Sequence, residues 1–492
     1  MTTTPILAGF YPDPSICRVE DTYYLVNSSF EYLPGLPLHA STDLLTWRSL
    51  GNALARPSQI EEHEGVANGG VFAPTIRHHD GRFWIVTTNI WDLGKGRGHF
   101  ILTAEDPSGP WSDPVHVPGA IGIDPDLAWD EDGTCQLTWA SFLPELKGIA
   151  SAPVDLATGV LLAPPRLLWQ GTGLAHPEGP HLYRVDGWWY LLLAEGGTER
   201  GHCVTIARGR SLDDAFEPAP HNPILTHRST TDPVQNVGHA DLIELADGSW
   251  AAVHLGVRPR GQTPLFHGLG RETFLVGIDW VDGWPFVVED RYLHVPVDHS
   301  FVDRFEGEHL DQRWLGAGSF PASFTTLLRP GLQVAADHRG PGKSLVACRV
   351  RDQQWSATAT IDTADGAARF LVRIDDRHWY GFEVEPHGIE VVLRIGPARQ
   401  TIATIDRSPG TPATLRITAL PGTENSLGAV EPDLIELSVA HPDGTVHVIG
   451  AFDGRYLSTE VAGGFLGRLV GVEALSGLPV IKELSYQART GF

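Results

Sequence analysis

The amino-acid sequence predicts an all-β protein with two domains, a five-bladed β-propeller over residues 1–298 and an antiparallel β-sandwich over residues 299–492. A chain of 492 residues exceeds the size at which a single hydrophobic core stops growing, so two domains are expected. The 54 glycines and 37 prolines indicate many turns and therefore many short strands. Hairpin turns recur through the first domain, and strict alternation of apolar and polar residues follows from about residue 301.

A polar turn that leads into an aromatic or β-branched strand occurs five times in the first domain. Four of the turns begin with Asp-Gly, the strongest short-range hairpin signal, and the fifth is Asp-Thr. Their aspartates are Asp21, Asp80, Asp132, Asp186 and Asp247, separated by 59, 52, 54 and 61 residues. A hairpin that returns every 50 to 60 residues, with little helical periodicity between copies, is typical of a propeller with four strands per blade.

One register position in this repeat carries an unusual set of side chains. The residues eight positions before the turn aspartates are Asp13, Phe72, Asp124, Glu178 and His239. The innermost strands of a propeller face one axis, so these five side chains are expected to converge at one mouth. Asp-Pro is also a common surface turn dipeptide, which is the alternative explanation for a single acid. Three acids at one register favour a functional site, because buried acids need a partner or a role.

The second domain shows period-two alternation in runs such as 355–361, 370–374 and 390–395. This pattern predicts antiparallel strands with one buried face each, packed as a sandwich. The segment 287–298 is expected to be an extended crossover between the domains. The alternation leaves the role of the second domain open between carbohydrate binding, structural support and closure of the pocket.

Three convergent carboxyl groups match the requirements of glycosidic bond hydrolysis, which needs one protonated acid and one ionised carboxylate. Repulsion between like charges and burial raise one pKa, so that an acid and a base coexist near neutral pH. Phe72 would provide an apolar wall for a sugar ring. His239 would bind a metal, donate a hydrogen bond or be a satisfied axial histidine, and the sequence leaves these three alternatives open. Arg271 follows a glycine at a strand start and is equally consistent with a surface position.

The formal charge of −24 argues against nucleic acid and anionic membranes as partners, because both repel a polyanion. No apolar run reaches the roughly 18 residues of a membrane span. The N-terminus shows no basic and apolar leader, and the four cysteines lack metal or redox spacing, so a cytoplasmic location is expected. The large sandwich offers surface for a homo-oligomer.

At the acidic positions the chain resembles glycoside hydrolase family 43, and further stretches are similar to its β-xylosidase branch. The acidic motifs are Tyr-Pro-Asp-Pro-Ser-Ile at 11–16, Asp-Pro-Asp-Leu at 124–127 and His-Pro-Glu-Gly-Pro at 176–180. The branch-like stretches are 28–37, 194–198 and 270–273. The resemblance covers the whole chain, since that branch pairs a five-bladed propeller with a C-terminal, concanavalin-like β-sandwich.

The resemblance implies an inverting exo-glycosidase that releases xylose from the non-reducing ends of β-1,4-xylo-oligosaccharides without a required cofactor. Asp13 would be the general base and Glu178 the general acid. Asp124 would tune the pKa of Glu178 and hold it in place. Arg271 would pair with Asp124 and contact sugar hydroxyls, and Phe30 would line the subsite of the released sugar.

One departure from the family pattern concerns the sugar platform. The family usually has Trp-Ala-Pro where this chain has Phe72-Ala73-Pro74, which leaves the choice between pyranose and furanose open. Some members cleave α-L-arabinofuranosides, and some carry a calcium ion on the propeller axis near the equivalent of His239. The sandwich of the family also sends a loop to the active site, but the sequence does not identify this loop. A non-catalytic sugar-binding protein is the remote alternative.

Overall fold

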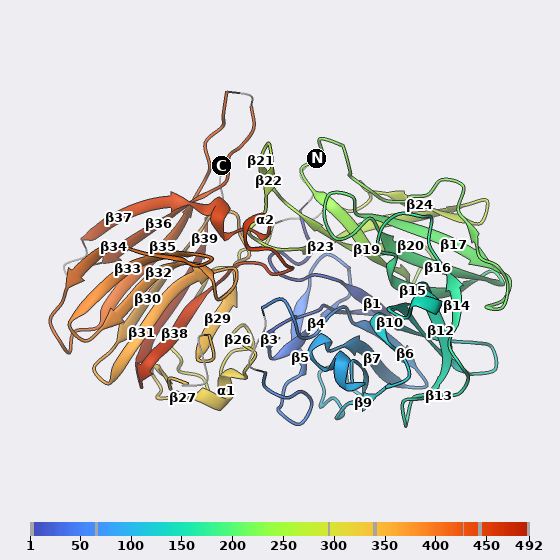
Figure 1. The fold of residues 1–492 in the computed structure, drawn as a ribbon, viewed down its shortest axis with the longest axis horizontal. Helices are drawn as coiled ribbons and strands as arrows, with labels where there is room; N and C mark the ends of the chain where they lie inside the picture. Colours follow the sequence, from blue (N-terminus) through green and yellow to red (C-terminus); the bar gives the residue numbers. More distant parts are fainter. Residues whose placement is uncertain are drawn as a thin grey trace.

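The structure is a computed structural model that describes residues 4–63, 67–293, 296–337, 342–426, 428–440 and 445–489. Figure 1 shows two β-rich lobes side by side, the N-terminal one in blue to green and the C-terminal one in yellow to red. Helices are short: η1 (Ile90–Lys95), η2 (Pro144–Leu146), α1 (Pro321–Phe324), η3 (Gly454–Leu457) and α2 (Thr459–Ala462). Within the described ranges, none of the helices has the length and apolar character needed to cross a membrane.

The N-terminal lobe is the predicted five-bladed propeller, and each blade is an antiparallel sheet. Blade 1 contains β1 (Ser15–Val19), β2 (Thr22–Val26), β4 (Gly35–Ser41) and β5 (Arg48–Leu54). Blade 2 contains β6 (Thr75–His79), β7 (Arg82–Thr88), β8 (His99–Ala104) and β9 (Val115–His116). Blade 3 contains β10 (Gly122–Trp129), β11 (Cys135–Ser141), β12 (Gly148–Asp155), β13 (Val160–Leu161) and β14 (Arg166–Trp169).

The last two blades complete a closed ring. Blade 4 contains β15 (Glu178–Val185), β16 (Trp188–Glu195), β17 (Cys203–Gly209) and β18 (Glu217–Pro218). Blade 5 contains β19 (Gln235–Glu244), β20 (Trp250–Val257), β23 (Glu272–Val281) and β24 (Trp284–Val288), with the small hairpin β21 (Arg260–Gly261) and β22 (Leu265–Phe266) beside it. The first strands of the blades contact one another in the order β1, β6, β10, β15, β19 and back to β1.

The repeated turns join the first two strands of each blade, as predicted. Asp80 and Gly81 have φ values of 51° and 72°, and Asp186 and Gly187 have values of 48° and 76°. Left-handed values at both central residues are those of a tight hairpin turn, for which Asp-Gly is a preferred sequence. Asp-Gly therefore marks these turns because both of its residues adopt the left-handed conformation that the turn requires.

A buried polar ring closes the propeller axis, with one side chain from the first strand of each blade. The Arg77 guanidinium lies 2.8 Å from Asp126 and 2.8 Å from Asp241, and both aspartates are fully buried. His181 Nδ1 lies 3.0 Å from the same guanidinium, and Ser15 donates a 2.6 Å hydrogen bond to Asp241. Burial alone would raise the pKa of Asp241, but Arg77 holds it below the usual range of a carboxyl group. Through these contacts, side chains from all five blades meet around the Arg77 guanidinium.

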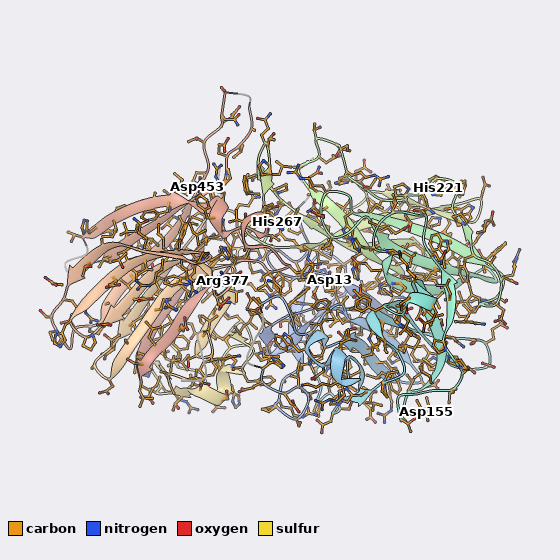
Figure 2. All side chains as sticks on the ribbon, viewed as in Figure 1. Asp13, Asp155, His221, His267, Arg377 and Asp453 are labelled. Carbon is orange, nitrogen blue, oxygen red and sulfur yellow. The ribbon has the colours of Figure 1, made fainter. Side chains whose placement is uncertain are left out.

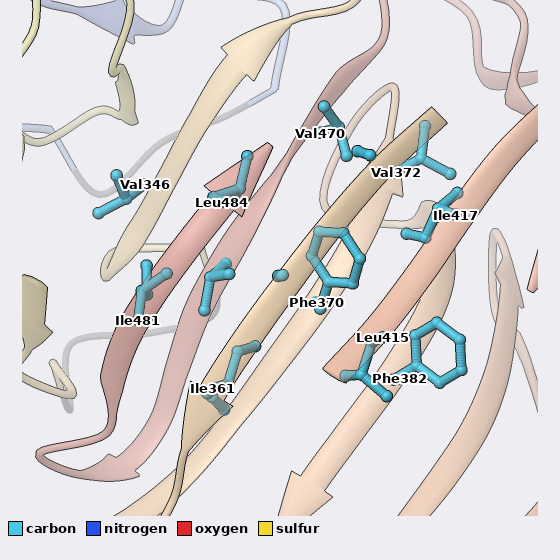
Figure 3. Close-up of a cluster of buried hydrophobic side chains, with 14 of the residues drawn as sticks. Val346, Ile361, Phe370, Val372, Phe382, Leu415, Ile417, Val470, Ile481 and Leu484 are labelled. Atoms are coloured by element: carbon cyan, nitrogen blue, oxygen red, sulfur yellow. The ribbon is translucent and has the colours of Figure 1, made fainter. Parts of the chain in front are cut away.

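The C-terminal lobe is a sandwich of two antiparallel sheets, as predicted. One sheet runs β27 (Thr325–Leu327), β28 (Leu332–Val334), β39 (Val480–Ala488), β30 (Trp355–Asp362), β35 (Ala413–Leu420), β36 (Leu434–Ala440) and β37 (Val446–Asp453), with β25 (Phe301–Asp303) beside β39. The other runs β29 (Leu345–Arg349), β38 (Leu469–Gly477), β31 (Gly366–Arg373), β32 (His378–Glu385), β33 (Gly388–Ile395) and β34 (Ala398–Asp406). Figure 3 shows Phe370, Ile417 and Leu484 in the buried layer between the sheets.

The two lobes are joined by strand pairing as well as by the chain. In the propeller, β3 (Tyr32–Leu33) pairs with β26 (Gly316–Ala317) of the C-terminal lobe. Next to this pair, Arg373 of β31 donates to Glu31 at 3.1 Å, and both side chains are buried. Strand β24 ends at Val288 and β25 begins at Phe301, and the predicted boundary after residue 298 stays a prediction within that interval.

The axial ring yields a prediction about stability. Replacing Arg77 by Met leaves two fully buried aspartates without their cation, which should lower the free energy of unfolding by about 3–5 kcal/mol. The matched control is Arg82→Gln on the same blade, because Arg82 forms an exposed pair with Glu105 and should cost less than about 1 kcal/mol. Denaturant titration of both variants measures the difference. Equal midpoints for the two would contradict the role given to the ring.

Candidate active site

The five predicted register positions lie at the starts of the innermost strands, on one side of the axial ring. Asp13 and Phe72 precede β1 and β6, Asp124 lies near the start of β10, Glu178 opens β15, and His239 lies in β19. Figure 2 places Asp13 on the side of the propeller that faces the sandwich. The repeat therefore brings three acids from blades 1, 3 and 4 to one end of the axis.

The backbone at this level is unusual. Asp13, Asp124 and His239 have φ values of 51°, 55° and 49°, the left-handed region that residues with a side chain rarely adopt. The strand pairing shifts register just after Asp124 and around His239, so these are bulges that redirect side chains. In blade 4 the left-handed residue is Gly179 instead of Glu178, with φ of 56°. Such strain typically clusters at functional sites.

Gly179 is required for close packing at the axis. A β-carbon on Gly179 would come within 3.0 Å of the His239 ring. The amide of Gly179 donates a 3.1 Å hydrogen bond to the Asp124 carboxylate. The absence of a side chain at this position thus lets Asp124, Glu178 and His239 crowd together.

Asp13 is held by donors on both carboxylate oxygens. It is 3% exposed, Ser28 donates to Oδ2 at 2.6 Å, and Arg271 Nη1 donates to Oδ1 at 2.7 Å. This corrects the expected pairing of Arg271 with Asp124. Arg271 precedes β23 of blade 5, next to blade 1, so its guanidinium meets Asp13, while Asp124 on blade 3 is bonded by Gly179 of blade 4.

Asp124 and Glu178 form a coupled acidic pair. Burial, followed by the charges of Glu178 and Asp13, raises the pKa of Asp124 well above its usual value. Burial and then the charge of Asp13 raise the pKa of Glu178 to about 7. Repulsion of this kind keeps one proton on the pair near neutral pH. No described residue hydrogen-bonds the Glu178 carboxyl group, which is partly exposed and free to meet a ligand.

Arg271 has spare hydrogen-bonding capacity at the same place. The side chain is 6% exposed, and Nη1 also donates to the Thr198 hydroxyl at 3.3 Å. Its Nε and Nη2 are buried without a partner among the described residues. Buried donors without a partner cost free energy, so these two N–H groups are available to the acceptor atoms of a bound ligand.

An aromatic wall stands next to Arg271. The ring of Phe30 lies 4.9 Å from that of Phe72 and 5.5 Å from that of Phe465, and the Arg271 guanidinium lies 5.2 Å from Phe30. Phe465 belongs to the sandwich, and its amide donates a 2.8 Å hydrogen bond to Asn68 of the propeller. The segment 463–467 is therefore a sandwich loop that reaches the site.

Three residues at the site were not predicted as site residues. Phe465 lies in Gly-Gly-Phe-Leu-Gly, a glycine-rich stretch with one aromatic residue that was a readable signal for a close-packed loop. Ser28 and Thr198 lie in the stretches 28–37 and 194–198 that resemble the family. Their contacts with Asp13 and Arg271 depend on the folded arrangement of the blades.

His239 is buried beside Asp13, with Nδ1 3.8 Å from Oδ1. Burial lowers the pKa of His239 to about 4, so the imidazole is neutral at neutral pH. The described residues contain no group of three or more His, Cys, Asp or Glu side chains that could hold a metal ion. Both Asp13 oxygens are already engaged, and one imidazole falls short of the six to eight oxygen ligands of calcium. The calcium site at His239 stays a prediction.

Known proteins with similar sequences and structures place this chain in a family. The model of glycosyl hydrolases family 43 matches residues 2–285. A non-reducing end α-L-arabinofuranosidase of Bacteroides ovatus is 35% identical over 96% of this chain and 90% of its own length. A xylosidase/arabinosidase of Butyrivibrio fibrisolvens is 34% identical over 97% of this chain and 96% of its own length.

The solved structure of Xyloglucan PUL GH43B from Bacteroides ovatus superimposes with a TM-score of 0.87 and 31% identity, covering 99% of both chains. This similarity includes the propeller and the sandwich together. With the acids, the arginine and the aromatic wall at one mouth, the conclusion is direct: the chain belongs to glycoside hydrolase family 43 and is a glycoside hydrolase.

Proposed function

We propose that the protein is an inverting exo-glycosidase that hydrolyses β-1,4-linked xylose from the non-reducing ends of xylo-oligosaccharides. The observation that carries this proposal is the contrast between two kinds of carboxyl group at one mouth. Asp13 accepts hydrogen bonds from Ser28 and Arg271, whereas the pKa values of Asp124 and Glu178 are both raised. An inverting glycosidase needs this difference, because one group must be ionised while another is protonated.

Asp13 is the proposed general base. Donors on both of its oxygens orient the carboxylate, and a water molecule that it deprotonates would attack the anomeric carbon. Glu178 is the proposed general acid, which gives its proton to the glycosidic oxygen as the bond to the anomeric carbon breaks. The water proton ends on Asp13, and the leaving sugar carries the proton from Glu178. Both carboxyl groups return to their starting states by exchange with solvent.

Asp124 and Arg271 are proposed to assist without exchanging protons with the substrate. Asp124 is proposed to tune the pKa of Glu178, because the two carboxyl groups are close enough for the charge of Glu178 to raise the pKa of Asp124. The hydrogen bond from the Gly179 amide to Asp124 holds the start of β15, where Glu178 lies. The unpartnered Nε and Nη2 of Arg271 are proposed to donate to sugar hydroxyls. His239, as a neutral imidazole at this mouth, is a proposed further donor.

The aromatic wall supports action on a terminal sugar. Phe30 and Phe72 come from the propeller and Phe465 from the sandwich, so one end of the site is bounded by both domains. Apolar rings pack well against the faces of sugar rings, and a bounded site fits a chain end better than a chain interior.

An α-L-arabinofuranosidase is the second candidate. The Bacteroides ovatus relative is named for this activity, and the Butyrivibrio fibrisolvens relative is named for both. Phe72 supports the same candidate, because a phenyl ring is a smaller platform than the indole that the family usually carries. Cytoplasmic location and a homo-oligomeric state stay predictions.

The proposed acid predicts a leaving-group effect. Replacing Glu178 by Ala should lower kcat/KM for xylobiose by about 10²–10⁴, the usual contribution of a general acid. Aryl xylosides with good leaving groups should lose far less, because they need little protonation. The exposed acid Glu131 gives the control variant Glu131→Gln, which should match the unchanged protein. Equal losses on both substrates would contradict the assignment.

The coupled pair predicts a pH profile. Glu178 must be protonated, so kcat/KM for xylobiose should fall as the pH rises through about 7. In the proposed tuning role Asp124 is ionised beside Glu178, so the variant Asp124→Asn removes a negative charge and should move this alkaline limb to lower pH. Asp132→Asn, on an exposed turn of the same blade, should leave the limb in place. An alkaline limb that does not move in Asp124→Asn would refute the tuning role.

Substrate ranking and stereochemistry are measured independently of these variants. We expect a higher kcat/KM on an aryl β-xylopyranoside than on an aryl α-arabinofuranoside, and the reverse order would favour the second candidate. An NMR time course on an aryl β-xylopyranoside, whose leaving group is not a sugar, should show α-xylose as the first product, because attack from the opposite face inverts the anomeric centre. First release of β-xylose from this substrate would exclude inversion.

A further inference from the structure

A pocket lies at the contact between the two domains. It shares no residue with the acidic mouth, the site formed by Asp13, Asp124 and Glu178. Its volume is about 480 Å³, and we call it the seam pocket. The propeller contributes Tyr11, His39 and Trp47, and the sandwich side contributes Arg349 and Arg351. The proposed hydrolysis gives this pocket no role.

The two arginines of the seam pocket have no counter-ion. Among the described residues, no carboxylate lies within the 4.0 Å ion-pair distance of Arg349 or Arg351, and the nearby Asp311 and Asp352 pair with Arg313 and His299 instead. Arg349 is 8% exposed, its Nε donates to the Phe10 carbonyl at 2.7 Å, and its Nη2 is buried without a partner. Burial and the neighbouring Arg351 lower the pKa of Arg349 below its usual value. A buried cation without a counter-ion is expensive, and Arg349 is such a cation in a chain with a net charge of −24, with the half-buried Arg351 beside it.

The remaining charged groups of the pocket do not neutralise them. Arg313 is paired with Asp311 at 2.8 Å, so these two groups cancel. Asp298 is exposed on the rim, where water and salt screen its charge. His39 is 6% exposed with Nδ1 unpartnered, and burial together with Arg351 and Arg349 lowers its pKa to about 3. A neutral His39 adds no negative charge.

The walls of the pocket fit a sugar as well as an anion. The Tyr11 ring lies 4.5 Å from the Arg349 guanidinium and 5.5 Å from that of Arg351, which holds both cations over one aromatic face. Trp47 is half-buried on the lining, and Ser49 and Gln312 add hydroxyl and amide groups. A volume of 480 Å³ exceeds the needs of an inorganic anion and falls in the range of small-molecule sites.

We propose that the seam pocket binds a phosphoryl dianion, either as a phosphorylated sugar or as free phosphate, through Arg349 and Arg351. Two guanidinium groups match a doubly charged phosphoryl group and offer the planar donor pairs that bind its oxygens bidentately. In a phosphorylated sugar the ring lies along the wall that contains Trp47. The binding is non-covalent and involves no reaction of the ligand.

The position of the pocket gives this ligand a structural effect. Arg349 and Arg351 donate to the carbonyls of Phe10 and Ala8, in the segment that leads directly to Asp13. A ligand that neutralises the two arginines therefore stabilises the docked arrangement of sandwich and propeller. A ligand that binds only the folded state also raises the melting temperature.

Isothermal titration calorimetry of the full chain without substrate tests the proposal with inorganic phosphate, glucose 6-phosphate and glucose. Both phosphates should bind, with a matching rise in Tm, and glucose alone should not. Tighter binding of glucose 6-phosphate identifies the ester as the preferred source, and equal binding identifies the phosphoryl group alone. Absence of binding by both phosphates, or equal binding by glucose, overturns the proposal.

Two variants locate the site, since Arg271 also carries unpartnered donors at the acidic mouth. Arg351→Gln should weaken phosphate binding at least about tenfold, the effect of losing a charged hydrogen bond. Ser49→Asp keeps both arginines and adds a negative charge to the exposed rim, so it should also weaken binding if Arg351→Gln fails to fold. Arg304→Gln, at an exposed pair with Glu483, is the control and should bind as the unchanged protein does. Wild-type affinity in both pocket variants would overturn the assignment to the seam pocket.

Discussion

The contact of Arg77 with Asp126 and Asp241 is the constraint on which the propeller depends. One guanidinium joins first strands from three blades, and Ser15 and His181 add the other two. Asp13, Asp124, Glu178 and His239 lie two or three residues before the ring residues of their own blades, whereas Phe72 lies five residues before Arg77. The acidic layer is therefore positioned by the salt-bridged layer next to it.

The ring around Arg77 and the acidic layer with Asp13, Asp124 and Glu178 differ in the number of acids per cation. This difference affects which carboxyl groups keep a proton. In the lower layer Arg77 faces two aspartates that accept several hydrogen bonds, and the pKa of Asp241 is lowered. In the upper layer Arg271 faces three acids and bonds one of them, Asp13. Burial and the charge of Asp13 raise the pKa of both Asp124 and Glu178, and the charge of Glu178 raises the pKa of Asp124 further. A proton stays at the mouth because burial and the repulsion among three carboxyl groups outweigh the one cation that faces them.

The sequence predicted what depends on periodicity and missed what depends on neighbours in space. Asp13, Asp124 and Glu178 were recognisable because each lies eight residues before the turn aspartate of its blade. The partner of Arg271 was predicted wrongly, because sequence spacing does not say which carboxylate a strand from blade 5 will meet after ring closure. Phe465 escaped prediction for a similar reason: its position at the site follows from the docking of two domains, which leaves no period in the chain.

The bond between the Phe465 amide and Asn68 connects residues 397 positions apart. One ring of the aromatic wall, Phe465, therefore belongs to a domain that carries none of the three acids. Recombination between relatives that exchanged only the sandwich would replace this ring and leave the acids unchanged. Such chimeras would inherit their chemistry from one parent and part of their substrate preference from the other. In this architecture, substitutions in either domain can change the substrate preference, because both domains contribute side chains to the site.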